Sequence, residues 1–128
     1  MKIIRKFTFC VLTYNHSQYI VEHLESVKFQ ILNYGKNIDC SIIINDDASN
    51  DNTVELIDKW FTANDQIFKH ISKIYNKFNI GTCDGVINIS NNLKTKYFKL
   101  TAGDDVYSST NIFNFLKKND RFSLLSGL

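Results

Sequence analysis

The chain alternates short, uninterrupted apolar runs with longer segments in which apolar residues recur at intervals of three or four positions. The runs have the length of strands and the periodic segments have the length of helices. Strands that are apolar on both faces are typical of parallel sheets, because helices cover such sheets on both sides. The alternation therefore predicts an α/β fold with a mostly parallel sheet.

Strand-length runs rich in β-branched and aromatic residues recur along the chain. They are Phe7 to Leu12, Cys40 to Asn45, His70 to Asn76 and Tyr97 to Ala102. A last apolar run, Arg121 to Leu128, is interpreted as the beginning of another strand.

The segments between these runs have helical periodicity. The first carries a row of apolar residues that ends near Gly35, where a C-cap would stop a helix: Ile20, Leu24, Val27 and Ile31. The second carries Val54, Ile57 and Phe61 after a polar stretch that can supply an N-cap. Further helices are predicted from Thr82 to Lys94 and from Ser109 to Asn119.

The chain has 128 residues, which is the size of one ordinary domain. Its net charge of +2 is too small to indicate a nucleic-acid partner. Cys10, Cys40 and Cys83 form no CxxC pair and leave an odd count, so neither a zinc site nor a disulfide framework is indicated. No apolar run approaches the roughly 20 residues of a spanning helix. We therefore expect a protein of the reducing cytoplasm.

Polar clusters follow the predicted ends of the first, second and fourth strands. They are Thr13 to Asn15, Asp46 to Asp51 and Gly103 to Asp105. Ligands of open parallel sheets bind beyond the carboxyl ends of the strands, so we expect the clusters to converge on one crevice. The carboxylates of Asp104 and Asp105 repel each other, and this pair predicts a cationic partner.

Each of these motifs also has a simpler explanation when it is taken alone. An Asp-Asp pair is commonly a solvated turn or a helix cap. The polar stretch after the second strand matches a calcium loop poorly, because Asn52 and Asp58 stand where such a loop needs glycine and glutamate. His16, His23 and His70 have no partner at metal-ligand spacing. The joint placement at successive strand ends favours a binding site over these explanations.

Together, the motifs resemble those of family 2 glycosyltransferases in order and spacing. The matching segments are VLTYNHSQYI, IIINDDASNDNTVELI, NIGT and YFKLTAGDDVYS, which together span nearly the whole chain. The resemblance implies the GT-A fold, a three-layer α/β/α sandwich. It implies that residues 1–128 form the nucleotide-sugar-binding part of such a domain and that the acceptor-binding part is absent.

The resemblance also implies which residues bind the donor nucleotide: Leu12, Thr13, Tyr14, Asn15, Asp47 and Asp104. The backbone of Leu12 and Thr13 and the ring of Tyr14 would contact the base. Asp47 would accept a hydrogen bond from the ring N–H of uracil, whereas cytosine presents a lone pair there. A UDP-sugar is therefore favoured over a CDP-sugar, and GDP stays open because guanine also carries a ring N–H.

A divalent metal, Mg²⁺ or Mn²⁺, is implied at the adjacent carboxylates. Asp105 would coordinate the ion, and Asp104 would contact the ribose or the metal shell. Such ions commonly take one or two carboxylates together with substrate phosphates. The ion would stabilise the nucleoside diphosphate as it leaves the sugar.

The chain departs from the family pattern at two positions. Leu12 stands where the family has proline. The Asn79–Gly81 segment is present, but the basic residue common a few positions later is replaced by the stretch from Asp84 to Val86. Phosphate binding would then be weaker or would use another residue.

The implied activity is an inverting transfer, in which a carboxylate base deprotonates the acceptor hydroxyl. That base is expected beyond Leu128. The expected acceptor is a glycan or a lipid-linked sugar of bacterial surface polysaccharide synthesis, at the inner face of the membrane if missing regions attach there. A donor-binding module without catalysis stays open. A sugar nucleotidyltransferase is disfavoured, because the residues from Leu12 to Gln18 include no glycine for a phosphate-binding loop.

Overall fold

The computed structural model describes residues 5–114. Its strands are β1 (Arg5–Thr13), β2 (Ile38–Asp46), β3 (Ile71–Tyr75) and β4 (Tyr97–Ala102). Its helices are α1 (Ile20–Tyr34), α2 (Thr53–Asn64) and α3 (Gly81–Asn92), with a short 3-10 turn, η1 (Asp65–Ile67). Every strand and helix predicted up to Ala102 is confirmed. Residues 109–113 of the helix predicted from Ser109 to Asn119 form bends and turns, so the helix does not begin where it was expected, and its remainder from residue 115 lies outside the described residues. The strand predicted from Arg121 lies wholly outside them.

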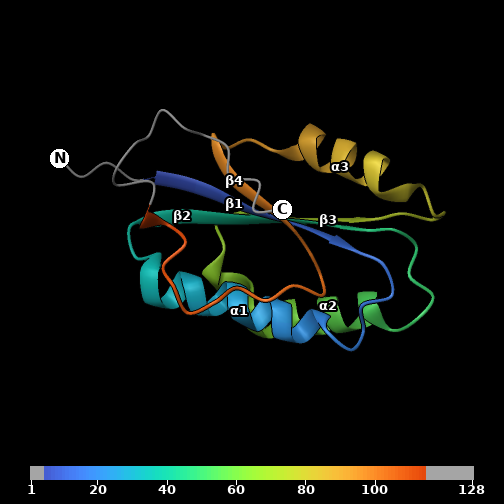
Figure 1. Cartoon of the computed structure of the whole chain (residues 1–128), viewed down its shortest axis with the longest axis horizontal. Coiled ribbons are helices and arrows are strands. Elements are labelled where there is room, and N and C mark those ends of the chain that lie inside the picture. The colour runs from blue at the N-terminus through green and yellow to red at the C-terminus, as the bar shows by residue number, and fades with distance from the viewer. Residues whose placement is uncertain (1–4, 115–128) are drawn as a thin grey trace.

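All four strands are parallel and lie in the order β3-β2-β1-β4. The helices α1 and α2 cover one face of the sheet and α3 covers the other (Figure 1). The chain therefore winds outward from β1 to β3 and then crosses back, so that β4 pairs with the opposite edge of β1. This α/β/α sandwich confirms the expected fold class and places a topological switch point between β1 and β4.

The two faces of the sheet have cores of unequal size. Phe7, Phe9 and Val11 point toward α1 and α2 and belong to a large buried cluster that includes Trp60. On the other face the buried residues are Cys10, Ile43 and Ile89, so α3 rests on a much smaller core. No helix within residues 5–114 has the length and hydrophobicity needed to cross a bilayer.

Candidate functional site

Three turns meet at the carboxyl end of β1. The Gly103 amide donates to the Leu12 carbonyl at 2.9 Å, and the Asp47 amide donates to the Thr13 carbonyl at 2.9 Å. A side chain at position 103 would have no room, because a Cβ there would lie 2.8 Å from Thr13 Cγ2 and 2.9 Å from His16 Nδ1. Glycine thus permits β4 to end against β1, and the predicted convergence of the polar clusters is confirmed.

The turns after β1 and β2 are joined through Asp46, which is 1% exposed. Its carboxylate accepts the hydroxyl hydrogens of Thr13 and Ser49, each at 2.6 Å, and the Ser49 amide at 2.9 Å. All three donors are brought to one buried carboxylate, so Asp46 fixes the shape of this junction. We did not select Asp46 from the sequence, although it adjoins Asp47 in the same motif.

Asn15 adds a second connection between the same turns. Its amide N–H donates to Ser49 Oγ at 2.9 Å, and its side-chain oxygen accepts the Asn50 amide at 2.7 Å. Asn15 holds a φ of +53°, in a region that asparagine tolerates better than most residues. Asn15 therefore bridges the turns, and Tyr14 beside it is 42% exposed, which leaves its ring available to a ligand.

Asn52 occupies the N-cap position of α2, but Asp51 supplies the capping hydrogen bond. Asn52 makes no side-chain capping bond, whereas Asp51 accepts the Thr53 amide at 3.0 Å and the Ser17 amide at 3.2 Å. Partial burial opposes ionisation, but hydrogen bonds from Thr53 and Ser17 lower the pKa of Asp51 to about 2. Asp51 is therefore ionised at neutral pH and anchors the turn after β1 to α2.

Asp47, the residue predicted to recognise the base, faces the beginning of α3. Its carboxylate accepts the amides of Ile80 at 2.7 Å and Gly81 at 3.0 Å, and the side chain of Asn76 at 3.2 Å. Desolvation opposes ionisation, but these three donors lower the pKa of Asp47. A carboxylate has about four acceptor positions, so one position stays available after these bonds.

The stretch that replaces the family's basic residue packs tightly at its centre. A Cβ on Gly85 would lie 3.0 Å from both Asn45 Nδ2 and Leu12 Cδ2. At position 85, α3 thus lies against side chains of β1 and β2, which would have to shift to admit a larger residue.

The acidic turn after β4 offers its charges to solvent. The side chain of Asp104 is 50% exposed, and its Oδ2 lies 3.9 Å from His16 Nε2. Asp105 Oδ2 accepts the Ala102 amide at 3.1 Å, and its other carboxylate oxygen has no hydrogen-bond partner within residues 5–114. Among residues 5–114, His16 is thus the one basic group within ion-pair distance of these carboxylates, and they keep free acceptor positions.

The donor set of this turn fits a hard divalent ion. Carboxylate oxygens are ligands that Mg²⁺ and Mn²⁺ prefer. No group of three His, Cys, Asp or Glu side chains among residues 5–114 is arranged to hold a metal. A metal at Asp104 and Asp105 would therefore need further oxygens from a bound phosphate or from water, which is the usual arrangement for Mg²⁺.

Two histidines near this turn have partners that sequence reasoning did not find. His16 lies beside Asp104, as described above, and its buried Nδ1 has no hydrogen-bond partner. His23 is fully buried on α1, and its Nδ1 lies 2.7 Å from the backbone oxygen of Asp105. No spacing rule could have indicated this contact, because the two residues are 82 positions apart.

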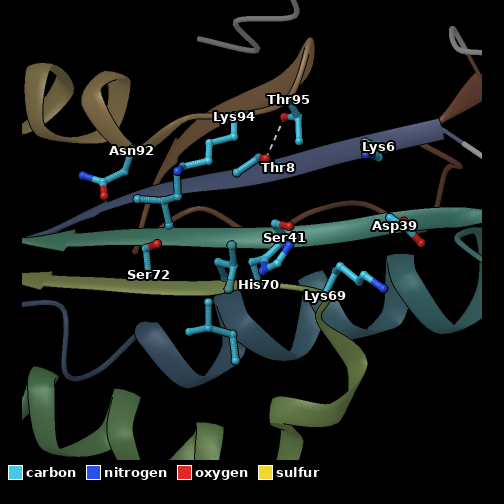
Figure 2. A pocket seen from close by; sticks show the side chains of 13 residues that line it. Lys6, Thr8, Asp39, Ser41, Lys69, His70, Ser72, Asn92, Lys94 and Thr95 are labelled. Atoms are coloured by element: carbon cyan, nitrogen blue, oxygen red, sulfur yellow. Dashed lines mark hydrogen bonds between the residues drawn. The ribbon is translucent and has the colours of Figure 1, made fainter.

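A large cavity lies away from this end of the sheet. It measures about 390 Å³ and lies at the amino ends of the strands on the α3 side, where Lys6, Lys69 and Lys94 border it (Figure 2). A smaller cavity of about 270 Å³ is lined by Asp105, Lys99 and the segment after the acidic turn. We place the candidate site at the carboxyl ends, because the carboxylates and the switch point are both there.

Comparisons with known proteins were made for sequence and for structure. Residues 8–121 match the family model described as Glycosyl transferase family 2. Over 53 residues the chain is 44% identical to Abequosyltransferase RfbV of Salmonella typhimurium strain LT2, a stretch that covers 41% of this chain and 15% of that protein.

Solved structures with the same fold include two glycosyltransferases. S. aureus TarS 1-349 in complex with UDP matches with a TM-score of 0.72 at 20% identity, over 88% of this chain and 31% of that one. Mannosyltransferase PcManGT from Pyrobaculum calidifontis, in complex with GDP-Man and Mn²⁺, matches with a TM-score of 0.76 at 18% identity, over 90% of this chain and 32% of that one. The chain thus spans about a third of the length of these solved relatives, and their GT-A fold is its fold.

Proposed function

Because the chain belongs to glycosyl transferase family 2, we propose that it is the donor-binding part of an inverting enzyme that transfers a sugar from a nucleoside-diphosphate sugar. The observation that carries this proposal is the meeting of three turns at the end of β1, where Asp104 and Asp105 keep free carboxylate oxygens. The complexes of TarS with UDP and UDP-GlcNAc, and of PcManGT with GDP-Man, support a donor of this class.

Asp47 recognises the base in this proposal. Its carboxylate is ionised and has one acceptor position left after bonding Ile80, Gly81 and Asn76. That position accepts the ring N–H of uracil and repels the ring lone pair of cytosine. The exposed ring of Tyr14 stacks on the base. UDP is therefore the favoured nucleotide.

Asp105, with Asp104 beside it, would hold Mg²⁺ or Mn²⁺ together with the donor phosphates. When bound there, such an ion supplies positive charge against the departing nucleoside diphosphate. The protein's own contribution is to keep both carboxylates exposed at the end of β4 and to hold that of Asp105 through the bond from the Ala102 amide. The ends of β1 and β2 would thus present Tyr14 and Asp47 to the base, and the end of β4 would present its carboxylates to the diphosphate.

The acceptor in this proposal is a glycan or a lipid-linked sugar, and the process is bacterial surface polysaccharide synthesis at the cytoplasmic side of the membrane. The likeness to a bacterial abequosyltransferase supports a role in sugar transfer. No residue between positions 5 and 114 is assigned as the base that deprotonates the acceptor. A donor-binding module without catalysis is the alternative. It needs a test of its own, because the chain spans about a third of the length of the solved relatives.

Nucleotide choice is the first test. Titration calorimetry of the unaltered chain should give tighter binding of UDP than of CDP. Asp47→Ala should erase this preference, and Asp47→Asn should shift it toward CDP, because the side-chain amide donates to the ring lone pair of cytosine. Asp58→Asn, on α2, is the control and should leave the preference unchanged. Equal affinities for UDP and CDP in the unaltered chain would contradict base recognition by Asp47.

A second measurement separates enzyme from binding module. With any other glycosyltransferase excluded from the preparation, a transferase part should release UDP from a UDP-sugar slowly at most, whereas a binding module should retain UDP affinity and release none. Detection of released UDP by chromatography distinguishes the two outcomes.

A further inference from the structure

One face of α1 is a stripe of polar side chains that hold the segment after β4. Its members, which we name the α1 stripe, are His23, Ser26, Gln30 and Tyr34. They are spaced by three or four residues, so they share one side of the helix. Each bonds a backbone group between Asp105 and Ile112, although nearly eighty residues separate the two segments.

Most members of the stripe act on the segment beyond the acidic turn. Gln30 is fully buried, and its amide donates to the backbone oxygens of Ser108 at 2.7 Å and Thr110 at 2.8 Å, while its oxygen accepts the Ile112 amide at 3.1 Å. The Tyr34 hydroxyl donates to the Ser109 carbonyl at 2.6 Å. These bonds hold the loop in place and do not involve the carboxylates of Asp104 and Asp105.

His23 is the member of the stripe that reaches the acidic turn itself. Its Nδ1 lies 2.7 Å from the Asp105 carbonyl oxygen, which can only accept, so Nδ1 carries the proton. Its Nε2 lies 3.5 Å from the Thr101 hydroxyl on β4. Burial lowers the pKa of His23, although the bond to Asp105 opposes the change.

We propose that His23 is a positioning residue for the acidic turn, which sets the direction of the Asp105 backbone so that both carboxylates face the metal-bound diphosphate. The inference rests on the proposed function, because it presupposes a metal and a donor diphosphate at Asp104 and Asp105. It assigns no contact between His23 and a ligand. The turn's other bonds run from the Gly103 amide to the Leu12 carbonyl, from the Asp105 amide to the Ala102 carbonyl at 3.0 Å, and from the Ala102 amide to the Asp105 carboxylate. These bonds hold the amide side of Asp105, whereas the carbonyl side is held by His23. Without the imidazole the peptide that follows Asp105 loses this restraint, and the carboxylate is free to turn away.

The test compares UDP affinity in Mn²⁺ with UDP affinity in chelator for variants of the complete chain. In the unaltered protein the ratio should be at least about tenfold, and His23→Leu should reduce it by about tenfold or more, the usual range when a residue that supports metal ligands is lost. His23→Asn places an amide N–H near the position of Nδ1 and should recover most of the ratio. His23→Gln places its amide near Nε2 and should not.

Gln30→Leu is the matched control on the same stripe. It removes three bonds to the loop and should lower the melting temperature more than His23→Leu does, yet it should preserve the Mn²⁺ ratio. A purely structural role of the stripe would move both quantities together in both variants. If His23→Leu does not fold, the contrast between His23→Asn and His23→Gln supplies the same test.

The outcomes separate this inference from the proposed function. Equal UDP affinity in Mn²⁺ and in chelator for the unaltered chain would overturn the metal site and, with it, the role of His23. A strong ratio that persists in His23→Leu, or that falls equally in Gln30→Leu, would overturn only the positioning role. A ratio lost in His23→Leu and His23→Gln but kept in His23→Asn and Gln30→Leu would establish it.

Discussion

The turns after β2 and after β4 both carry adjacent aspartates, yet they use them in opposite ways. After β2, Asp46 is buried and accepts three hydrogen bonds from the protein, and Asp47 accepts three more. After β4, Asp104 is half exposed and has one ionic neighbour among the described residues, the His16 imidazole at 3.9 Å, and the Asp105 carboxylate accepts one hydrogen bond from them. The first turn is thus built to hold its own shape, and the second keeps charge available.

Because of this difference, one edge of the sheet combines a firmly bonded turn with a turn whose carboxylates are exposed. A carboxylate that accepts several protein donors stabilises a turn and keeps few acceptor positions for a ligand, one in the case of Asp47. The β4 turn leaves its carboxylates open and is held through its backbone instead, by Leu12 from β1 and by His23 from α1. Substitutions at equivalent aspartates should therefore have different consequences in the two turns.

The largest expected effect is on stability, from Asp46→Ala. The substitution leaves the Thr13 hydroxyl and both Ser49 donors without an acceptor in a buried site. We expect the free energy of unfolding to fall by about 3 kcal/mol, since each unsatisfied buried group costs about 1–3 kcal/mol and the turn relaxes in part. Urea unfolding followed by circular dichroism measures it.

Asp104→Ala is the matched substitution in the β4 turn. Because its side chain is half exposed, it should change the free energy of unfolding by less than about 0.5 kcal/mol. Similar losses for Asp46→Ala and Asp104→Ala would remove the distinction between the two turns.

The next effect is on ligand binding, from Asp105→Asn. This change keeps the size of the side chain and removes the charge that attracts a divalent ion. UDP binding should lose most of its Mn²⁺ dependence, about 1–3 kcal/mol, while contacts to the base persist. Calorimetry in Mn²⁺ and in chelator is the measurement.

Asp58→Asn is the control for that experiment. Asp58 lies on α2, where Lys73 at 2.8 Å and the Tyr75 hydroxyl at 2.7 Å donate to it, far from the end of β4 in the chain. It should leave the Mn²⁺ dependence intact. The same loss in Asp58→Asn and Asp105→Asn would place the charge effect outside the acidic turn.

The smallest effect is on the pH dependence of stability, from Asp51→Asn. The pKa of Asp51 is about 2 in the folded chain and about 3.9 in an unfolded chain. A lowered pKa contributes stability that is fully present above about pH 4 and is lost as the pH falls toward 2. Asp51→Asn should therefore flatten the fall of the melting temperature between pH 4 and pH 2. An unchanged slope would show that Asp51 does not contribute there.

Much of the architecture could be predicted from the sequence, because burial on both faces leaves a pattern. The runs that became β1 and β2 are apolar at successive positions, and the row from Ile20 to Ile31 has helical spacing. The convergence of the clusters around Thr13, Asp47 and Gly103 also followed, because the carboxyl ends of parallel strands lie at one edge. The functions assigned to Asp47, Asp104 and Asp105 stay predictions.

Only the tertiary structure decided how those turns are supported. The sequence shows no partner for His23, and its bond to Asp105 depends on how α1 packs beside the end of β4. Asp47 accepts a hydrogen bond from the first residue of α3, and Asp46 accepts hydrogen bonds from Thr13 and Ser49. These bonds depend in the same way on the packing of helices against strands. The physical reason is that these bonds join side chains to distant partners, often backbone groups. Every residue carries a backbone carbonyl and nearly every residue an amide, so sequence spacing cannot mark which one a buried side chain will meet.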